Sequence, residues 1–189
     1  MKNIELFASV TENLQYFTGT IAVDKDFAAG GVAKLSATGI GAGWAVGDYF
    51  ALTASANSNI TFKITYVHAD DSYVLATAHS ENGVAVAVGA DESGSGDEKM
   101  NQVYYTDWQD LSGYWEASAT VYASGACDAT IQQSWAGTYV DVNGTKSDIS
   151  AATPTVLDED VKCRFGRLKL LAEDAGCTYM RAYFGGKMS

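Results

Sequence analysis

Cysteine and histidine, which supply many nucleophilic and metal-binding side chains, are scarce in this sequence. The 189 residues include three cysteines and two histidines. Cys127, Cys163 and Cys177 are odd in number and lack CxxC spacing, which argues against a disulfide framework and against a zinc site. We therefore expect buried free thiols in a protein made in the cytoplasm, with no metal and no cofactor.

Long apolar runs and helical periodicity are also missing. No apolar run approaches the roughly 20 residues of a membrane span, so we expect no membrane partner. Glu5 interrupts what would be the apolar part of a signal peptide, so we expect no cleaved leader. Helical spacing is limited to residues 151–161 and 170–175, each long enough for about one turn.

Basic residues are few, and the excess of acidic over basic residues differs between the two halves of the chain. The net charge is −11; residues 1–98 carry four Lys and 12 Asp or Glu (net −8), and residues 99–189 carry eight Lys or Arg and 11 Asp or Glu (net −3). Proteins that bind nucleic acid neutralise phosphates with basic patches. The charge therefore argues against a nucleic-acid partner, and a solvated acidic surface is the simpler interpretation.

What the sequence does contain is strict alternation of apolar and polar residues, the pattern of half-buried β-strands. It is clearest over residues 60–65, 114–123 and 128–135. Asn82-Gly83, between two apolar segments, is typical of a type I′ hairpin turn and predicts a hairpin ending in a strand at residues 84–88. The chain is predicted to be all-β.

A polar stretch rich in Gly and Ser, residues 89–102, has the composition of a linker. We place a domain boundary there. The prediction is a small β-barrel-like domain with a short N-terminal arm over residues 1–98, followed by an antiparallel β-sandwich of jelly-roll or immunoglobulin type over residues 99–189. An extended loop within one larger domain is the alternative.

Candidate catalytic groups do not converge in the sequence. His68 and His79 flank the Asp70-Asp71 turn, but a catalytic pair also needs a nucleophile, and a zinc site needs further ligands. Acidic residues that could serve glycoside hydrolysis or calcium binding show no regular spacing; they are Asp107, Asp110, Asp158, Glu159, Asp160, Asp91, Glu92, Asp97 and Glu98. We expect ordinary polar positions, no catalytic residue and no enzyme activity.

Aromatic residues are numerous, with four Trp and 11 Tyr. By the alternation, Trp115 and Trp135 fall on core-facing sides of strands. Trp108, Tyr114 and Tyr122 remain as a possible subunit contact or sugar platform, and aromatic residues are enriched at protein interfaces.

A basic stripe is the other candidate for partner contact. Between Val161 and Leu171 the apolar parity switches at Gly166, as it does at a β-bulge. On that interpretation four cations point outward together, namely Lys162, Arg164, Arg167 and Lys169. They form either a solvated strand face or a docking surface for an acidic partner, which Arg pairs well.

Residues 43–50 and 53–81 resemble a small β-barrel module that recurs in structural proteins of tailed bacteriophages. The corresponding parts are Val46-Gly47-Asp48, the Ser/Asn-rich turn 54–59, the strand 61–67 and the acidic turn 69–72. The sequence departs from the module at Asn59-Ile60, where Gly-Thr is frequent, and by the extra residue Tyr66.

Residues 108–184 resemble compact β-sandwich domains of phage heads and tails. The similarity lies in residues 108–121, Ile131 to Ser134, Arg164 to Leu170 and the closing strand up to Phe184. Ala136-Gly137 stands where such domains often have Asp-Gly.

Together the two resemblances imply a virion structural protein. The form we favour is a head decoration (cement) protein, which would bind the major capsid protein on the outer head surface as a homotrimer. A tail or host-adsorption protein, with glycan binding, is the alternative.

Overall fold

In the computed structural model, residues 4–12, 14–84 and 86–188 are described, and every regular element among them is a β-strand. The strand pairs with a described register are antiparallel. The predicted all-β fold with antiparallel sheets is confirmed. The described residues contain no helix that could cross a membrane.

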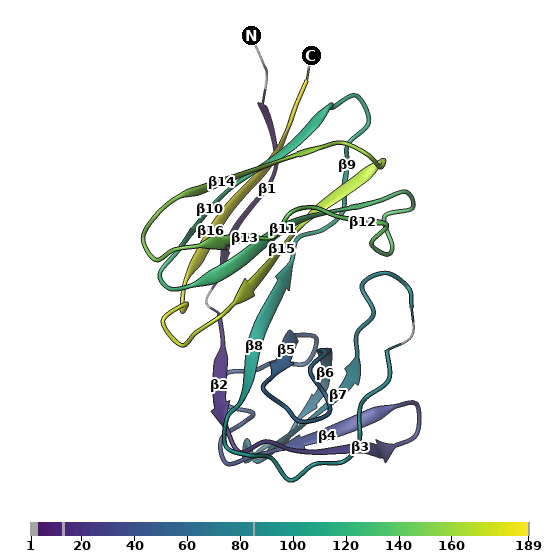
Figure 1. Ribbon diagram of the computed structural model, residues 1–189, viewed down its shortest axis with the longest axis vertical. Helices are drawn as coiled ribbons and strands as arrows, with labels where there is room; N and C mark the ends of the chain where they lie inside the picture. Colours follow the sequence, from purple (N-terminus) through teal and green to yellow (C-terminus); the bar gives the residue numbers. More distant parts are fainter. Residues whose placement is uncertain (1–3, 13, 85, 189) are drawn as a thin grey trace. The chain divides into compact units, whose positions relative to one another are not determined.

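The chain folds into two compact units whose boundaries differ from the expected 1–98 and 99–189. The central unit comprises residues 15–80 and 84–103, and the terminal unit comprises residues 1–14, 81–83 and 104–189. The reason lies in β1 (Ile4–Glu12), which pairs with β16 (Met180–Lys187) near the other end of the chain. The expected N-terminal arm is thus a strand of the terminal unit (Figure 1).

The terminal unit is a β-sandwich. One sheet has the order β1-β16-β10-β14. In the other, β11 pairs with β12, β13 and β15, and β15 also pairs with β9. The remaining bounds are β9 (Gln109–Asp110), β10 (Glu116–Ala123), β11 (Cys127–Ser134), β12 (Val142–Asn143), β13 (Ser147–Ile149), β14 (Thr155–Asp160) and β15 (Phe165–Ala172).

Alternation along the strands builds the core of this sandwich. Ala117, Ala119 and Val121 of β10 are buried, and so are Ala129 and Ile131 of β11, as their sequence parity predicts. Because these inward residues are small, they leave space for the ring of Phe184 from β16, which is fully buried in the same cluster.

The central unit is built on strands in the order β2-β8-β5-β6-β7-β4-β3. Its core includes Phe50 of β5 and Phe62 of β6, whose rings stack with centroids 5.3 Å apart. The bounds are β2 (Tyr16–Gly19), β3 (Ala22–Ala28), β4 (Val32–Ser36), β5 (Tyr49–Thr53), β6 (Thr61–Val67), β7 (Tyr73–Ala78) and β8 (Glu98–Tyr105).

The extra residue noted in β6 has a structural counterpart. The β6–β7 register shifts between Ile64 and Tyr66, so Thr65 is a bulge residue, and its hydroxyl donates to the Leu75 carbonyl at 3.1 Å. After the bulge, the side chains that would have faced the core face outward. Tyr66 is therefore exposed, although it is two residues after the buried Ile64. An added residue in a strand must be absorbed in this way if the core positions on either side are to be kept.

Two other local predictions were wrong. The expected linker 89–102 is partly ordered strand, since β8 begins at Glu98. The turn at 81–83 exists, with Gly83 at φ +75°, but residues 84 and 86–88 form no strand and Val84 is exposed. Residue 85 of the predicted strand lies outside the described residues.

Glu98 explains why the start of β8 is ordered. Its carboxylate is almost fully buried and accepts four hydrogen bonds, from the backbone N–H groups of Ile21 (3.2 Å), Ser95 (2.5 Å) and Gly96 (3.0 Å) and from the Ser95 hydroxyl (2.8 Å). Burial alone would raise the pKa of Glu98, but these donors outweigh it and lower the pKa to about 2.

Replacing Glu98 with Gln is expected to destabilise the central unit by about 2 kcal/mol at pH 7, because the amide NH₂ would face donors in place of an acceptor. The lowered pKa stabilises the folded chain above the pKa of Glu in the unfolded chain. This contribution is lost as the pH falls through the folded pKa, so the difference between wild type and E98Q should shrink on acidification. Urea unfolding at pH 7 and pH 3, with the exposed neighbour Asp97→Asn as control, checks both points.

Candidate binding face on the terminal unit

The outward face of the sheet β1-β16-β10-β14 carries the candidate site. In β16, Met180, Ala182 and Phe184 are buried, so the alternate residues Arg181 and Tyr183 face outward. The antiparallel register places Arg181 opposite Tyr122 and Tyr183 opposite Thr120 of β10. Directly opposed residues lie on the same face of a sheet, so the four side chains form one surface.

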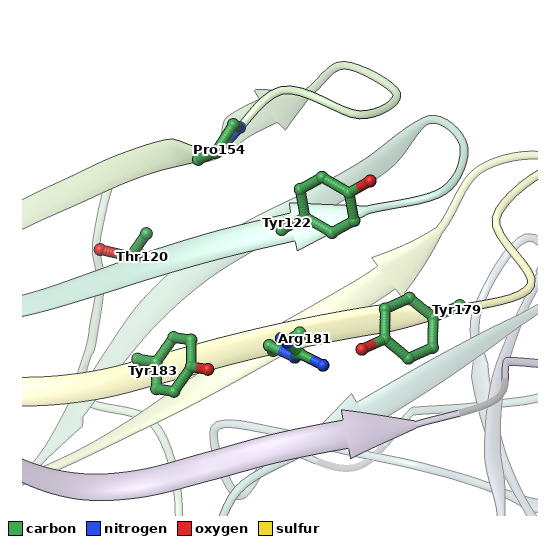
Figure 2. Close-up of a pocket in the computed structure, with 6 residues that line it drawn as sticks. All are labelled: Thr120, Tyr122, Pro154, Tyr179, Arg181 and Tyr183. Carbon is green, nitrogen blue, oxygen red and sulfur yellow. The ribbon is translucent and has the colours of Figure 1, made fainter.

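This surface is hollowed into a groove. Its cavity volume is about 440 Å³, and the described residues that line it are Thr120, Tyr122, Pro154, Tyr179, Arg181 and Tyr183. Figure 2 shows Tyr179, Arg181 and Tyr183 following one another along β16 and its approach, with Thr120 and Tyr122 on β10 and Pro154 just before β14. We call this feature the tyrosine groove.

Among the described residues of the groove, Arg181 is the charged one. Its guanidinium carbon lies 5.8 Å from the centre of the Tyr179 ring. Interactions with Tyr179 and then Tyr183 raise the pKa of Arg181 above its ordinary value, so the side chain is positively charged at any physiological pH. An aromatic surface with one fixed cation is chemically suited to an apolar ligand that also bears an anionic group.

Sequence reasoning identified Tyr122 but missed Tyr179, Arg181 and Tyr183. The signal was present, because Tyr-Met-Arg-Ala-Tyr-Phe alternates polar or aromatic residues with apolar ones over residues 179–184. What could not be read from the sequence was the register that places this strand beside Tyr122.

The other two aromatic residues predicted as a contact surface, Trp108 and Tyr114, do not line the groove. Trp108 packs on the Arg167 guanidinium, 4.5 Å from ring centre to carbon. Tyr114 lies in a turn before β10, where its N–H donates to the Leu111 carbonyl. The three aromatics predicted as a platform therefore belong to separate local environments.

The prediction that Trp115 and Trp135 face the core was wrong. Trp115 is 37% exposed and Trp135 is 65% exposed. Both lie one residue outside a strand, Trp115 before β10 and Trp135 after β11. At Ser134 the chain turns, and the Ser134 hydroxyl accepts the N–H groups of Ala136 and Gly137, so the alternation no longer decides which way the next side chain points.

The predicted basic stripe is divided. Residues 161–164 form the connection between β14 and β15, and Gly166 sits in regular pairing with Gln133, so the parity switch is a turn and not a bulge. Lys162 is exposed in that connection. Arg164 forms an ion pair with Asp110 at 3.0 Å, and both side chains are largely exposed.

Arg167 and Lys169 belong instead to a polar network on the outer face of β15. Lys169 Nζ lies 2.6 Å from Glu81 Oε1, and Glu81 also accepts hydrogen bonds from the Tyr105 hydroxyl and from Gln132 Nε2. Arg167 Nε donates to Gln132 Oε1 at 2.9 Å. These two cations alternate with buried residues as predicted, but they are half-buried and paired within the terminal unit, so they form no exposed stripe with Lys162 and Arg164.

The two histidines lie at opposite ends of β7. His68 Nδ1 contacts both the Asp70 carboxylate and, at 3.5 Å, the Ser72 hydroxyl. A catalytic relay needs the acid and the nucleophile on different ring nitrogens, and this arrangement closes the β6–β7 turn instead. The Ser72 donors, followed by His68, lower the pKa of Asp70 to about 2. His79 packs edge-on against Tyr49, with ring centres 4.6 Å apart.

Several of the acidic residues considered as catalytic or calcium-binding candidates accept hydrogen bonds from backbone N–H groups instead. Asp110 accepts the Ser112 N–H at 2.8 Å, Asp91 accepts the Lys25 N–H at 2.9 Å and Glu92 accepts the Ala56 N–H at 2.9 Å. Asp158 pairs with Lys187 at 2.8 Å. Within the described ranges, no group of three or more His, Cys, Asp or Glu is arranged to hold a metal ion.

No protein-family model matches the chain, and no curated protein matches it. One solved structure, that of the infectious bursal disease virus Gx strain, aligns with 98% of this chain and 72% of its own at 10% identity, with a TM-score of 0.28. Similarity at that level does not bear on function.

Proposed function

We propose that this chain is a non-enzymatic structural protein of a tailed-bacteriophage virion. Within that class, we assign it as a head decoration protein that binds the major capsid protein on the outer head surface, as a homotrimer. The similarity of residues 43–81 and 108–184 to phage virion modules favours this class. The tyrosine groove is the observation that carries the docking function.

The composition of the groove is that of a protein interface. Tyr and Arg are the residues that, with Trp, most often dominate binding energy when they are packed against a partner. A protein that binds the assembled lattice and not free subunits stabilises that lattice by its binding free energy. No chemical step is needed for such a role.

The test uses heads that lack this protein. Purified wild-type chain should bind them and raise their melting temperature. Tyr183→Ala and Tyr122→Ala should each weaken binding by at least about tenfold, as loss of an interface hot spot does. Tyr66→Ala, which removes an equally exposed tyrosine from the central unit, is the matched control and should bind within about twofold of wild type.

Equal binding by wild type and both groove variants would rule out the groove as the docking surface. Binding to tails and not to heads would exclude the decoration role. Lys162 and Arg164 remain predicted partner contacts, and Arg164→Glu in the same assay measures whether that end of the sandwich also takes part.

A tail or host-adsorption protein is the second candidate. The observation that favours it is the exposure of Tyr122 and Tyr183 in the groove, because flat aromatic faces also stack on sugar rings. Tryptophan and tyrosine fluorescence changes on addition of host glycans would support this function over the decoration role.

A further inference from the structure

Among its described lining residues, the tyrosine groove has a cation but no matching acid. The whole chain has 23 Asp or Glu against 12 Lys or Arg, yet the described lining includes Arg181 and no carboxylate. Among the side chains that the structure describes, no ion pair includes Arg181. The local charge is therefore opposite in sign to that of the protein.

Lys187 on the same strand provides the contrast. It lies on the same face as Arg181 and forms ion pairs with Glu116 and, at 2.8 Å, with Asp158. The two cations are six positions apart along the strand, roughly 20 Å, so those carboxylates do not reach the groove. This sheet thus neutralises one cation and leaves the other available to a ligand.

The apolar surface continues beyond the groove to the edge of the sheet. The register places Val156 of β14 opposite Thr120, in the row that begins at Tyr183. Val156 is 61% exposed, and β14 is the last strand in the order of its sheet. An edge strand presents unpaired backbone groups to another extended chain. A branched apolar side chain here favours a peptide over a hydroxyl-rich sugar.

The geometry points to an extended acidic segment of a partner protein as the occupant of the tyrosine groove. An Asp or Glu carboxylate of that segment pairs with the Arg181 guanidinium, and apolar side chains beside it pack on Tyr122, Tyr183 and Val156. The planar guanidinium binds a carboxylate through two parallel hydrogen bonds, and the flanking tyrosine rings exclude water from the pair. This inference rests on the proposed docking function of the groove.

The experiment selects binders from a random 12-residue peptide library on immobilised wild-type protein and on Arg181→Gln. Peptides selected on wild type should be enriched in Asp or Glu next to apolar residues, and the enrichment should vanish on Arg181→Gln. In one selected peptide, changing the acid to its amide should weaken binding to wild type by about tenfold or more and leave binding to Arg181→Gln unchanged. Lys99→Gln removes an exposed positive charge from the central unit and should behave like wild type.

Three results would overturn the inference. The first is equal acid content in peptides selected on wild type and on Arg181→Gln. The second is binding of sialylated or glucuronate-containing glycans that depends on Arg181 and exceeds binding of any selected peptide. The third is self-association in sedimentation that depends on Arg181, which would make a second copy the occupant. If any of these holds while Tyr183→Ala still abolishes head binding, the docking function stands and only the acidic segment is excluded.

Discussion

Replacing Phe184 with Ala is expected to lower the free energy of unfolding of the terminal unit by about 4 kcal/mol, through lost burial and the cavity left behind. Phe184 has no exposed surface, and its ring fills space that small residues leave open. A Cβ built on Gly166 of the opposite sheet would lie 3.3 Å from the tip of that ring. Urea unfolding followed by tryptophan fluorescence measures the loss, since Trp108, Trp115 and Trp135 all lie in this unit.

Tyr183 is the matched control because it is the neighbouring aromatic residue on the opposite face of β16. Tyr183→Ala should cost less than about 1 kcal/mol while reducing partner binding. Phe184→Leu, which keeps most of the buried volume, should lose less than the Ala variant. Equal destabilisation by Phe184→Ala and Tyr183→Ala would contradict the assignment of the two faces.

Replacing Glu81 with Ala is expected to destabilise the terminal unit by about 3 kcal/mol, because a half-buried Lys169 would lose its counter-ion. The Gln132 amide and the Tyr105 hydroxyl would also lose their acceptor. Urea unfolding at pH 7 measures this effect. The double variant Glu81→Gln, Lys169→Met should recover most of the loss, since it removes the unpaired charge. Asp26→Ala, which breaks the exposed Lys25–Asp26 pair, should cost under about 0.5 kcal/mol.

The effect of Glu81 should depend on pH. Burial raises the pKa of Glu81, but Lys169 and the three hydrogen bonds outweigh burial and leave the pKa below its ordinary value. The stabilisation is therefore present above the pKa of Glu in the unfolded chain, about 4.3, and is lost as the pH falls through the lower folded value. A stability gap between wild type and Glu81→Gln that stays constant from pH 7 to pH 3 would contradict the ion pair.

The strands could be predicted where apolar and polar residues alternate without interruption. Several residues are buried as predicted, because side-chain direction in a strand follows from local geometry alone; they are Phe62, Ile64, Ala117, Ala119, Val121, Ala129 and Ile131. The same rule failed for Trp115 and Trp135, one residue beyond a strand end. The strand at 84–88, predicted from the Asn82-Gly83 turn, was also wrong, because residues 84 and 86–88 form no strand.

The candidate site was only partly accessible to sequence reasoning. Tyr122 was identified from its outward parity, whereas Arg181 and Tyr183 were not, because their proximity to Tyr122 depends on pairing between strands about 60 residues apart. For the basic stripe the error is the opposite one, because residues predicted to contact a partner are paired within the chain. Arg167 and Lys169 follow the expected alternation, but Glu81, distant in the sequence, neutralises Lys169.

The sequence alone determined that this protein is all-β and, for most strands, which side chains enter the core, because both depend on residues close together in the chain. Tertiary structure decided the division into units, through the pairing of β1 with β16. It also decided which charges are compensated, leaving Arg181 available while Lys169 and Lys187 are paired. Strand register and ion pairing depend on contacts between residues far apart in the chain. A local sequence pattern contains no information about such contacts.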